Sequence, residues 1–121
     1  MKTEDYIYAA VEAADLHKGE HICALSVEKA SQVTDYYLIL TGRNRMHTKA
    51  LAREIDKALH ALGRDYMRSE GMREGTWILL DYGDFVVQIF DPETRTYYDL
   101  DGLWGDMPQL DLKDYVTAAE A

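Results

Sequence analysis

Hydrophobic residues recur along the chain at helical spacing in two places. Between Ile7 and Ala14 they return every three or four residues, which predicts an amphipathic helix over residues 4–17. A second, better-defined apolar stripe predicts a helix that Asn44 caps and that ends at Gly63. Each helix would bury one face and leave the other in water.

Shorter apolar runs, rich in β-branched and aromatic residues, predict strands. The runs are "HICALSVEK", "DYYLILTG", "WILLD" and "FVVQIF". The last two predict a hairpin that turns through Tyr82 and Gly83. We expect a loop, with a short strand near residues 65–68, from "DYMRSEGMREG", and a last short strand from "TRTYYDLDGLWGD".

The order of these elements predicts an α/β fold, in which a single compact domain has a mixed β-sheet flanked by helices. A chain of 121 residues has the usual size of one domain. We place the domain at residues 1–110 and a C-terminal tail at residues 111–121, and we expect little structure beyond Asp111.

The chain is acidic, with 22 Asp and Glu against 13 Lys and Arg and a formal net charge of −9. This balance repels phosphate backbones and membrane surfaces and attracts basic proteins. The first residues lack the apolar segment of a signal peptide, no apolar stretch has the length of a membrane span, and Cys23 has no second cysteine to pair with. We therefore expect a soluble cytoplasmic protein.

Two carboxylates, Asp81 and Asp84, flank the turn of the predicted hairpin. Carboxylates at a strand end can hold Mg²⁺, as in nucleotide-transfer enzymes, can dock a basic partner, or can simply suit the turn. No glycine-rich phosphate loop precedes a helix, no G-x-S-x-G motif occurs, and the four histidines are not spaced as metal ligands. We expect no catalytic residue, metal or cofactor; a divergent Mg²⁺-dependent nucleotide-binding or nucleotidyltransferase enzyme is the alternative.

Tyrosine and tryptophan exceed what a small core needs, with nine and two residues against two phenylalanines. Both types anchor interfaces because they combine a large apolar area with a polar group. Their mixture with acids near strand ends predicts a docking surface for a basic, partly apolar partner, and favours a binding module over an enzyme. The aromatic residues concerned are Tyr36, Tyr37, Trp77, Tyr82, Tyr97, Tyr98 and Trp104.

The second predicted helix carries a basic residue at every fourth position, namely Arg45, Lys49, Arg53 and Lys57. We call these four residues the basic stripe. It is either a solvated helix face or a contact to RNA or to an acidic partner, and both interpretations remain open.

Four segments together are similar to the Iojap-like ribosome silencing factors. They are "DYYLILTG", "ALAREI" in the basic helix, "EGTWILLDYGDFVVQIF" and "RTYYDLDGLWGD", and their order and spacing match from about Tyr6 to Pro108. The resemblance implies a nucleotidyltransferase-like fold that lacks the catalytic motif, and a protein that is not an enzyme. It also implies binding to the large ribosomal subunit through its universal protein fourteen, which blocks association with the small subunit and represses translation, and a homodimer when the protein is free.

By the same resemblance, family motifs place a partner-binding set on this chain. Gly42 and Gly83 are expected to serve tight turns, whereas Gln88 and Ser26 depart from the family pattern of a histidine and an acid. We expect at most a peripheral contact with ribosomal RNA and none with a membrane, and an interaction module for a non-ribosomal partner remains a further interpretation. The predicted partner-binding residues are Asp35, Tyr36, Glu74, Trp77, Asp81, Tyr82, Asp84, Tyr98, Leu103 and Trp104.

Overall fold

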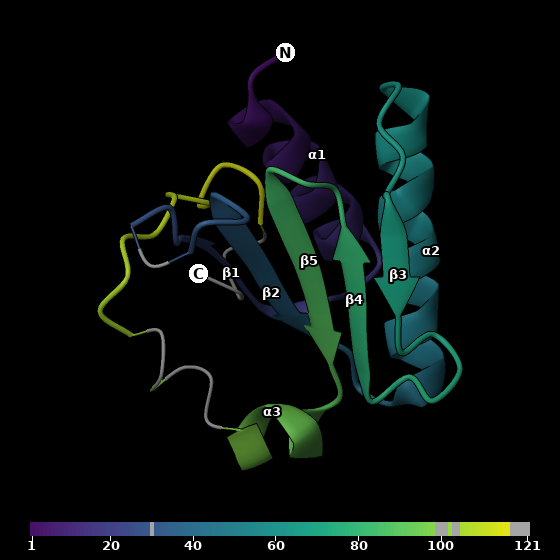
Figure 1. Cartoon of the computed structure of the whole chain (residues 1–121). Coiled ribbons are helices and arrows are strands. Elements are labelled where there is room, and N and C mark those ends of the chain that lie inside the picture. The colour runs from purple at the N-terminus through teal and green to yellow at the C-terminus, as the bar shows by residue number, and fades with distance from the viewer. Residues whose placement is uncertain (30, 99–101, 103–104, 117–121) are drawn as a thin grey trace.

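A computed structural model describes residues 1–29, 31–98, 102 and 105–116 of the chain. Within these residues, helices and a five-stranded sheet form one α/β domain, and Figure 1 looks onto the sheet with the two long helices behind it. In chain order, the elements are α1 (Thr3–Leu16), β1 (Glu20–Ser26), β2 (Tyr36–Thr41), α2 (Arg45–Ala61), β3 (Arg68–Glu70), β4 (Trp77–Asp81), β5 (Phe85–Phe90) and α3 (Pro92–Tyr98).

The five strands form one sheet in the order β1-β2-β5-β4-β3. The central pair, β2 and β5, is parallel, and the other three pairs are antiparallel. The predicted single α/β domain with a mixed sheet flanked by helices is therefore confirmed. Because β2 and β5 are parallel, their C-terminal ends meet at one edge of the sheet, where α3 lies (Figure 1).

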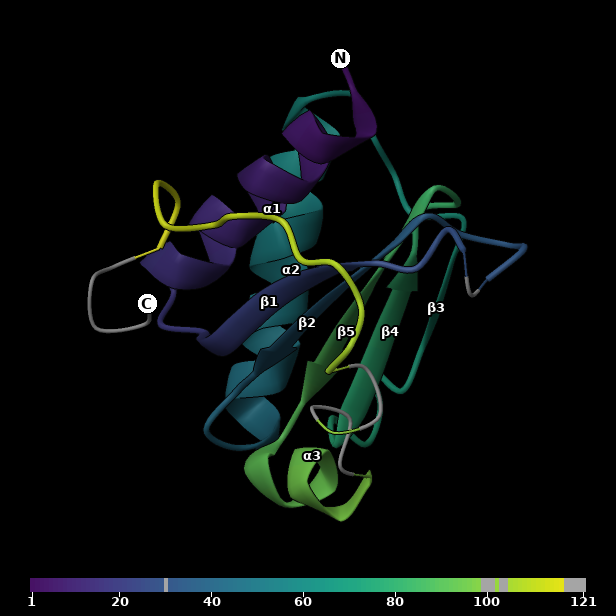
Figure 2. The ribbon, with the colours of Figure 1, turned by 90° about the vertical axis from the view of Figure 1, so that its left-hand side faces the viewer.

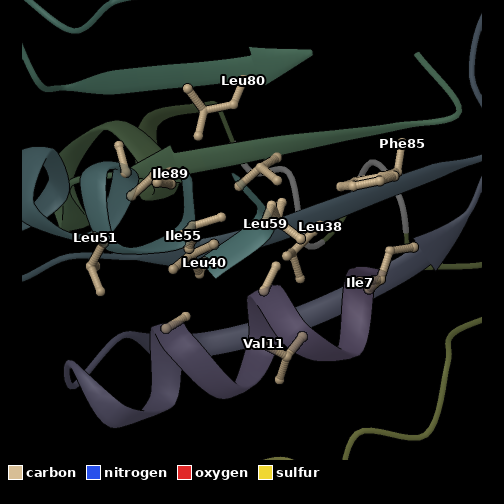
Figure 3. Packing of buried hydrophobic residues seen from close by; sticks show 14 of the residues in the cluster. Ile7, Val11, Leu38, Leu40, Leu51, Ile55, Leu59, Leu80, Phe85 and Ile89 are labelled. Carbon is tan, nitrogen blue, oxygen red and sulfur yellow. The ribbon is translucent and has the colours of Figure 1, made fainter. Parts of the chain in front are cut away.

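The main core lies between the sheet and the helices α1 and α2, which pack on the same face of the sheet (Figure 2). Figure 3 shows the buried apolar side chains of α1 directed toward the strands, as their helical spacing predicts. A smaller cluster covers part of the other face of the sheet around Ile39 and Phe90. The labelled members of the main core are Ile7, Val11, Leu38, Leu40, Leu51, Ile55, Leu59, Leu80, Phe85 and Ile89.

The helix α2 begins and ends where the sequence predicts. The Asn44 side chain accepts a hydrogen bond from the backbone N–H of His47 (2.9 Å), and Gly63 has a positive φ of 82° just beyond the last turn. Gly42, expected to serve a tight turn, has another role. A Cβ on Gly42 would lie 2.8 Å from Cγ2 of Thr48, so this glycine lets the end of β2 pack closely against the first turn of α2.

The prediction of a last strand in "TRTYYDLDGLWGD" is wrong within the described residues, because α3 covers residues 92–98. Pro92 takes the first helical position, and the Asp91 side chain accepts a hydrogen bond from the N–H of Thr94 (2.8 Å). An Asp-Pro pair that ends a strand is thus also a good helix start. The short strand expected near residues 65–68 lies slightly later, as the three-residue edge strand β3.

The C-terminal segment lies along the outer edge of β1. Ser26 donates its N–H to the carbonyl of Pro108 (2.7 Å), and Leu110 donates its N–H to the carbonyl of Ala24 (2.9 Å). In Figure 2 this segment, in yellow, runs along β1 toward α1. The backbone groups on this edge of the sheet are therefore partly satisfied by residues far along the chain.

Packing continues past Asp111, where the sequence predicts little structure. Leu112 is buried within the main core, and the ring of Tyr115 stacks on Tyr8 with centroids 4.3 Å apart. The domain boundary at residue 110 stays a prediction, since packing on the domain is not by itself a test of where the domain ends.

Candidate functional site

The residues predicted to bind a partner divide between the two ends of β4. Asp81 and Asp84 lie at its C-terminal end, and Trp77 lies at its first residue. Four residue steps of strand separate these ends, or roughly 13 Å. Leu103 and Trp104 lie outside the described residues.

At the hairpin turn, Asp81 shapes the backbone. Its Oδ1 accepts a hydrogen bond from the N–H of Gly83 (2.8 Å), and its Oδ2 accepts one from Nε of Arg68 (3.1 Å). Gly83 has a φ of 94°, which is the left-handed region expected for a tight turn. One oxygen of Asp81 therefore serves the turn and the other joins β4 to β3.

Asp84 uses both carboxylate oxygens within the fold. Its Oδ1 accepts a hydrogen bond from Nη2 of Arg64 (2.6 Å), and its Oδ2 accepts one from Oγ1 of Thr3 (2.6 Å). Partial burial raises the pKa of Asp84, but the hydrogen bonds from Arg64 and Thr3 outweigh it, so the pKa lies below its usual value. The same guanidinium donates to the carbonyl of Tyr82 (2.8 Å) and lies over the Tyr6 ring. Asp84 thus joins the hairpin turn to the start of α1 and the end of α2.

Tyr82, a candidate anchor by sequence, has a side chain that belongs to the core. It is only 3% exposed, and its ring stacks on Phe85 with centroids 4.8 Å apart. Its hydroxyl has no hydrogen-bond partner among the described residues, and burial raises its pKa. A partner could not reach this ring without opening the domain.

Asp35 and Tyr36 lie at the start of β2, at the same end of the sheet as the hairpin turn. Asp35 is exposed. The hydroxyl of Tyr36 donates a hydrogen bond to Glu4 (2.7 Å), and this bond, with partial burial, raises the pKa of Tyr36 to about 12. Tyr36 therefore fixes α1 to the sheet, while Asp35 is open to solvent.

An aromatic cleft of about 360 Å³ lies at the other end of β4, between the start of that strand and α3. The rings of Trp77 and Tyr98 have centroids 5.0 Å apart, and those of Tyr97 and Tyr98 also lie 5.0 Å apart at an angle of 80°. Tyr97 is 81% exposed and Tyr98 49% exposed, and Glu93 is an exposed acid on the same helix. We use the term aromatic cleft for Trp77, Glu93, Tyr97 and Tyr98, with Thr76 and Thr94 completing its lining.

Trp77 belongs both to the aromatic cleft and to the sheet. Its indole N–H donates to Oε1 of Gln88 (3.0 Å), and its ring lies 4.9 Å from that of Phe90. With 36% of its surface exposed, Trp77 is fixed on one side and open on the other. Such a preorganised aromatic side chain suits an interface, because little side-chain freedom is lost on binding.

The loop before β4 positions Trp77 through two glycines. Gly71 and Gly75 have φ values of 80° and 78°, and a Cβ on Gly71 would lie 1.9 Å from the carbonyl oxygen of Trp77. The carbonyl of Gly75 also accepts a hydrogen bond from Oγ1 of Thr48 (2.6 Å), which fastens the loop to α2. Glu74 is exposed on this loop.

The structure thus brings Trp77 and Tyr98 together and places Asp35, Tyr36, Asp81, Tyr82 and Asp84 elsewhere. Tyr97 is one of the aromatic residues of the docking surface predicted from the sequence, although it is not in the partner-binding set carried over from the family. Glu93 is in neither group, and both residues line the aromatic cleft. The signal for them is the Asp91-Pro92 helix start, because a helix here puts residues 93, 94, 97 and 98 on one face.

The basic stripe remains on the surface of α2. Arg45, Arg53 and Lys57 are exposed and Lys49 is half-buried. Of the ion pairs formed within the described part of the chain, none involves these four residues. Glu54, on the same helix, pairs instead with His17 of α1 (3.2 Å).

Among residues 1–29, 31–98, 102 and 105–116, no three His, Cys, Asp or Glu side chains gather as they would to hold a metal ion. No helix in those ranges is long and apolar enough to cross a membrane.

Sequence comparison finds similarity along the whole chain. The family described as "Ribosomal silencing factor during starvation" matches residues 1–121. A ribosomal silencing factor from Bacillus subtilis is 39% identical over 112 residues, which are 93% of this chain and 95% of its own length. One from Halalkalibacterium halodurans is 34% identical over 117 residues, which are 97% of this chain and 100% of its own length.

Structural comparison agrees with the sequence. A crystal structure of a protein from Chromobacterium violaceum has a TM-score of 0.82 and 35% identity, and the match covers 87% of this chain and 88% of that chain. Another, from Bacillus halodurans, has a TM-score of 0.79 and 34% identity, covering 91% of this chain and 100% of that one.

Proposed function

Because this chain belongs to the family of ribosomal silencing factors, we propose that it binds the large ribosomal subunit and blocks association with the small subunit, so that translation is repressed. The proposed contact on the large subunit is its universal protein fourteen. Family membership supports a role in ribosome silencing, and the aromatic cleft is the observation that supports a docking surface.

The aromatic cleft suits a basic side chain of a protein partner. Three neighbouring rings, each at least 36% exposed, line the cleft, and Glu93 supplies a negative charge in the same lining. A Lys or Arg side chain over an aromatic face gains about 0.5–2 kcal/mol, and more contact area comes from the exposed part of Trp77. The formal net charge of −9 favours encounter with a basic partner.

We propose that Glu74, Trp77 and Tyr98 form the described centre of the docking surface. Glu93 and Tyr97 join this centre. Leu103 and Trp104 also belong to the predicted partner-binding set, but they lie outside the described residues. Asp35 is a proposed contact at the periphery. Tyr36, Asp81, Tyr82 and Asp84 are used by contacts within the fold, so we assign them to maintaining the domain.

Steric exclusion of the small subunit requires affinity and position and involves no reaction, so we propose a regulator that is not an enzyme. A protein of this kind would act in the cytoplasm and form a homodimer when it is free of the ribosome. We also propose a peripheral contact between the basic stripe and ribosomal RNA, because its charges have no ion-pair partners within the described part of the chain.

Sedimentation with isolated ribosomal subunits tests this function. The protein is expected to migrate with the large subunit alone and to reduce the formation of joined ribosomes. Tyr97→Ala combined with Glu93→Lys should weaken binding by about tenfold, since an exposed ring and a charge are lost together. Glu28→Lys is the matched control, because Glu28 is exposed at the end of β1 and outside the aromatic cleft.

The results of this experiment distinguish a failure of the proposed function from a failure of the proposed docking surface. A folded protein that does not migrate with large subunits would overturn the proposed function. Normal binding by the double variant would keep the function and move the docking surface away from the aromatic cleft. Equal loss in the Glu28→Lys control would show that overall charge, and not this cleft, determines binding.

A further inference from the structure

The helix α1 carries a second apolar stripe that the sheet does not cover. Its core stripe contains Ile7, Ala10, Val11 and Ala14. Ala9, Ala13 and Leu16 follow the same helical spacing on a neighbouring face. Ala9 and Ala13 are half-buried against the main core, whereas Leu16 is 76% exposed. The apolar surface of α1 is therefore wider than the part that the core buries, and its open side, which ends at Leu16, can serve as a further packing surface.

This second stripe forms one wall of a groove of about 650 Å³. The other wall is formed by Ala58 of α2 and by Leu62, the residue that directly follows this helix. Tyr115 and Val116 of the C-terminal segment also line the groove. Figure 2 shows α1 and α2 beside each other on this side of the sheet, with the yellow segment reaching α1.

The small residues in the groove would let a helix from another molecule pack beside α1 and α2. Ala9, Ala13 and Ala58 line it with single methyl groups, so the backbone of an added helix could come close to both walls. Residues 9, 12, 13 and 16 form ridges at i, i+3, i+4 and i+7, the arrangement into which side chains of another helix pack. An extended peptide would find no free strand edge here, because the groove lies between helices.

The charge of the groove indicates which kind of helix would bind there. Glu12 and Asp114 are exposed acids in the lining, and none of the lining residues within the described part of the chain is basic. A helix with basic residues beside its apolar stripe would match the acids as well as the methyl groups and leucines.

We propose that this groove is a second docking site, which takes a basic amphipathic helix of a partner protein. The site is distinct from the aromatic cleft, since the two share no lining residue. The protein can therefore hold a helix of one partner at α1 and α2 while α3 and the start of β4 contact another. This proposal does not depend on the function proposed above.

A designed peptide tests the chemistry of the groove. The probe is a fluorescent helix of about 18 leucine and lysine residues, with leucine at i, i+3, i+4 and i+7. Binding to the full chain is measured by fluorescence anisotropy. A peptide of the same composition in scrambled order, which breaks the apolar stripe, should bind at least about tenfold more weakly.

Two variants test whether the peptide binds in the groove. Ala13→Phe fills the groove without changing its charge, and Glu12→Lys with Asp114→Lys reverses its charge; each should weaken binding by about tenfold or more. Glu28→Lys with Asp106→Lys makes the same charge change at exposed positions outside the groove and should leave binding within about twofold. Melting temperatures of all variants are compared, so that a variant that fails to fold is not counted.

Three results would overturn the proposal. Equal binding of the ordered and scrambled peptides would show attraction by charge alone. Equal effects of the groove variants and the control pair would show that the peptide does not bind in the groove. If Ala13→Phe instead converts a dimer to a monomer in sedimentation equilibrium, the occupant is a second copy of this chain. Failure of peptide binding with normal sedimentation on large subunits would leave the proposed silencing function intact.

Discussion

At the scale of single residues, the two aspartates of the hairpin turn form contacts within the fold, although their position in the sequence suggests a docking role. Each is engaged by neighbouring groups, and Asp84 accepts hydrogen bonds at both oxygens. A charged residue at a turn can thus be used inside the fold even when the sequence around it is polar. Glu93 in the aromatic cleft and Glu74 on the loop before β4 are exposed, and neither forms an ion pair among the described residues.

Asp84→Asn should lower the free energy of unfolding by about 1.5–3 kcal/mol, the usual contribution of a hydrogen bond to a charged group. The variant leaves the Arg64 guanidinium without its carboxylate partner. Urea unfolding at neutral pH measures the loss. Asp35→Asn, at an exposed position, is the control and should change stability by less than about 0.5 kcal/mol.

The pH dependence of the same pair has a definite sign. The pKa of Asp84 is lowered in the folded protein, so its stabilisation is present above the unfolded pKa of about 4 and is lost as pH falls through the folded value. The stability difference between the wild-type protein and Asp84→Asn should therefore shrink below about pH 4. A difference that stays constant down to pH 2 would contradict the Arg64–Asp84 assignment.

Tyr82→Phe should preserve or raise stability, because the buried hydroxyl of Tyr82 has no hydrogen-bond partner among the described residues. An unsatisfied buried polar group costs about 1–3 kcal/mol, and phenylalanine keeps the stacking on Phe85. Thermal unfolding checks this, with Tyr36→Phe as the control that loses a hydrogen bond to Glu4 and should be destabilised. A less stable Tyr82→Phe would reveal a partner for the hydroxyl.

At the scale of elements, the loop before β4 controls where Trp77 lies. Gly71→Ala should destabilise the domain by more than about 2 kcal/mol, because it combines a positive φ with a Cβ 1.9 Å from a carbonyl oxygen. Gly63→Ala is the matched control. It has a similar φ of 82° but nothing within 4 Å, so only the backbone cost of about 1 kcal/mol is expected. Equal losses in chemical unfolding would mean that the loop adapts to the methyl group.

Most elements could be predicted from sequence because their local signals agree with their surroundings. Asn44 and Gly63 mark α2, and the apolar runs mark β4 and β5 at their observed bounds. The helix α3 was missed because aromatic residues favour strands, while its capping pattern at Asp91 and Pro92 favours a helix. The three rings of the aromatic cleft are among the aromatic residues that the sequence predicts for a docking surface. Glu93 could not be predicted with them, because it joins them on one face only when residues 92–98 are helical.

At the scale of the whole molecule, charge is unevenly arranged. The chain is strongly acidic, yet the basic stripe on α2 makes no ion pair within the described ranges. Phosphate groups of RNA would neutralise these basic side chains, and the binding would release counterions from the RNA. The sequence could show the stripe but not whether neighbouring acids cover it.

Arg45→Glu combined with Arg53→Glu tests the RNA contact. The pair should weaken binding to large subunits by about three- to tenfold and make binding less dependent on salt, because fewer counterions are released. Lys2→Glu with Lys29→Glu changes the net charge equally at exposed positions outside α2 and should have a smaller effect. Equal losses, measured by sedimentation at several salt concentrations, would indicate overall charge repulsion without an RNA contact.

The position of residues 108–110 on the edge of β1 has a consequence for synthesis of the chain. All five strands precede these residues, so every strand leaves the ribosome before the edge of β1 is covered. During that interval the free groups of Ala24 and Ser26 can pair with a strand of another chain, as exposed sheet edges do. When several ribosomes translate one messenger RNA close together, the nascent chains would therefore tend to misassemble at β1. Faster synthesis of the last residues would shorten the time for which this edge is exposed.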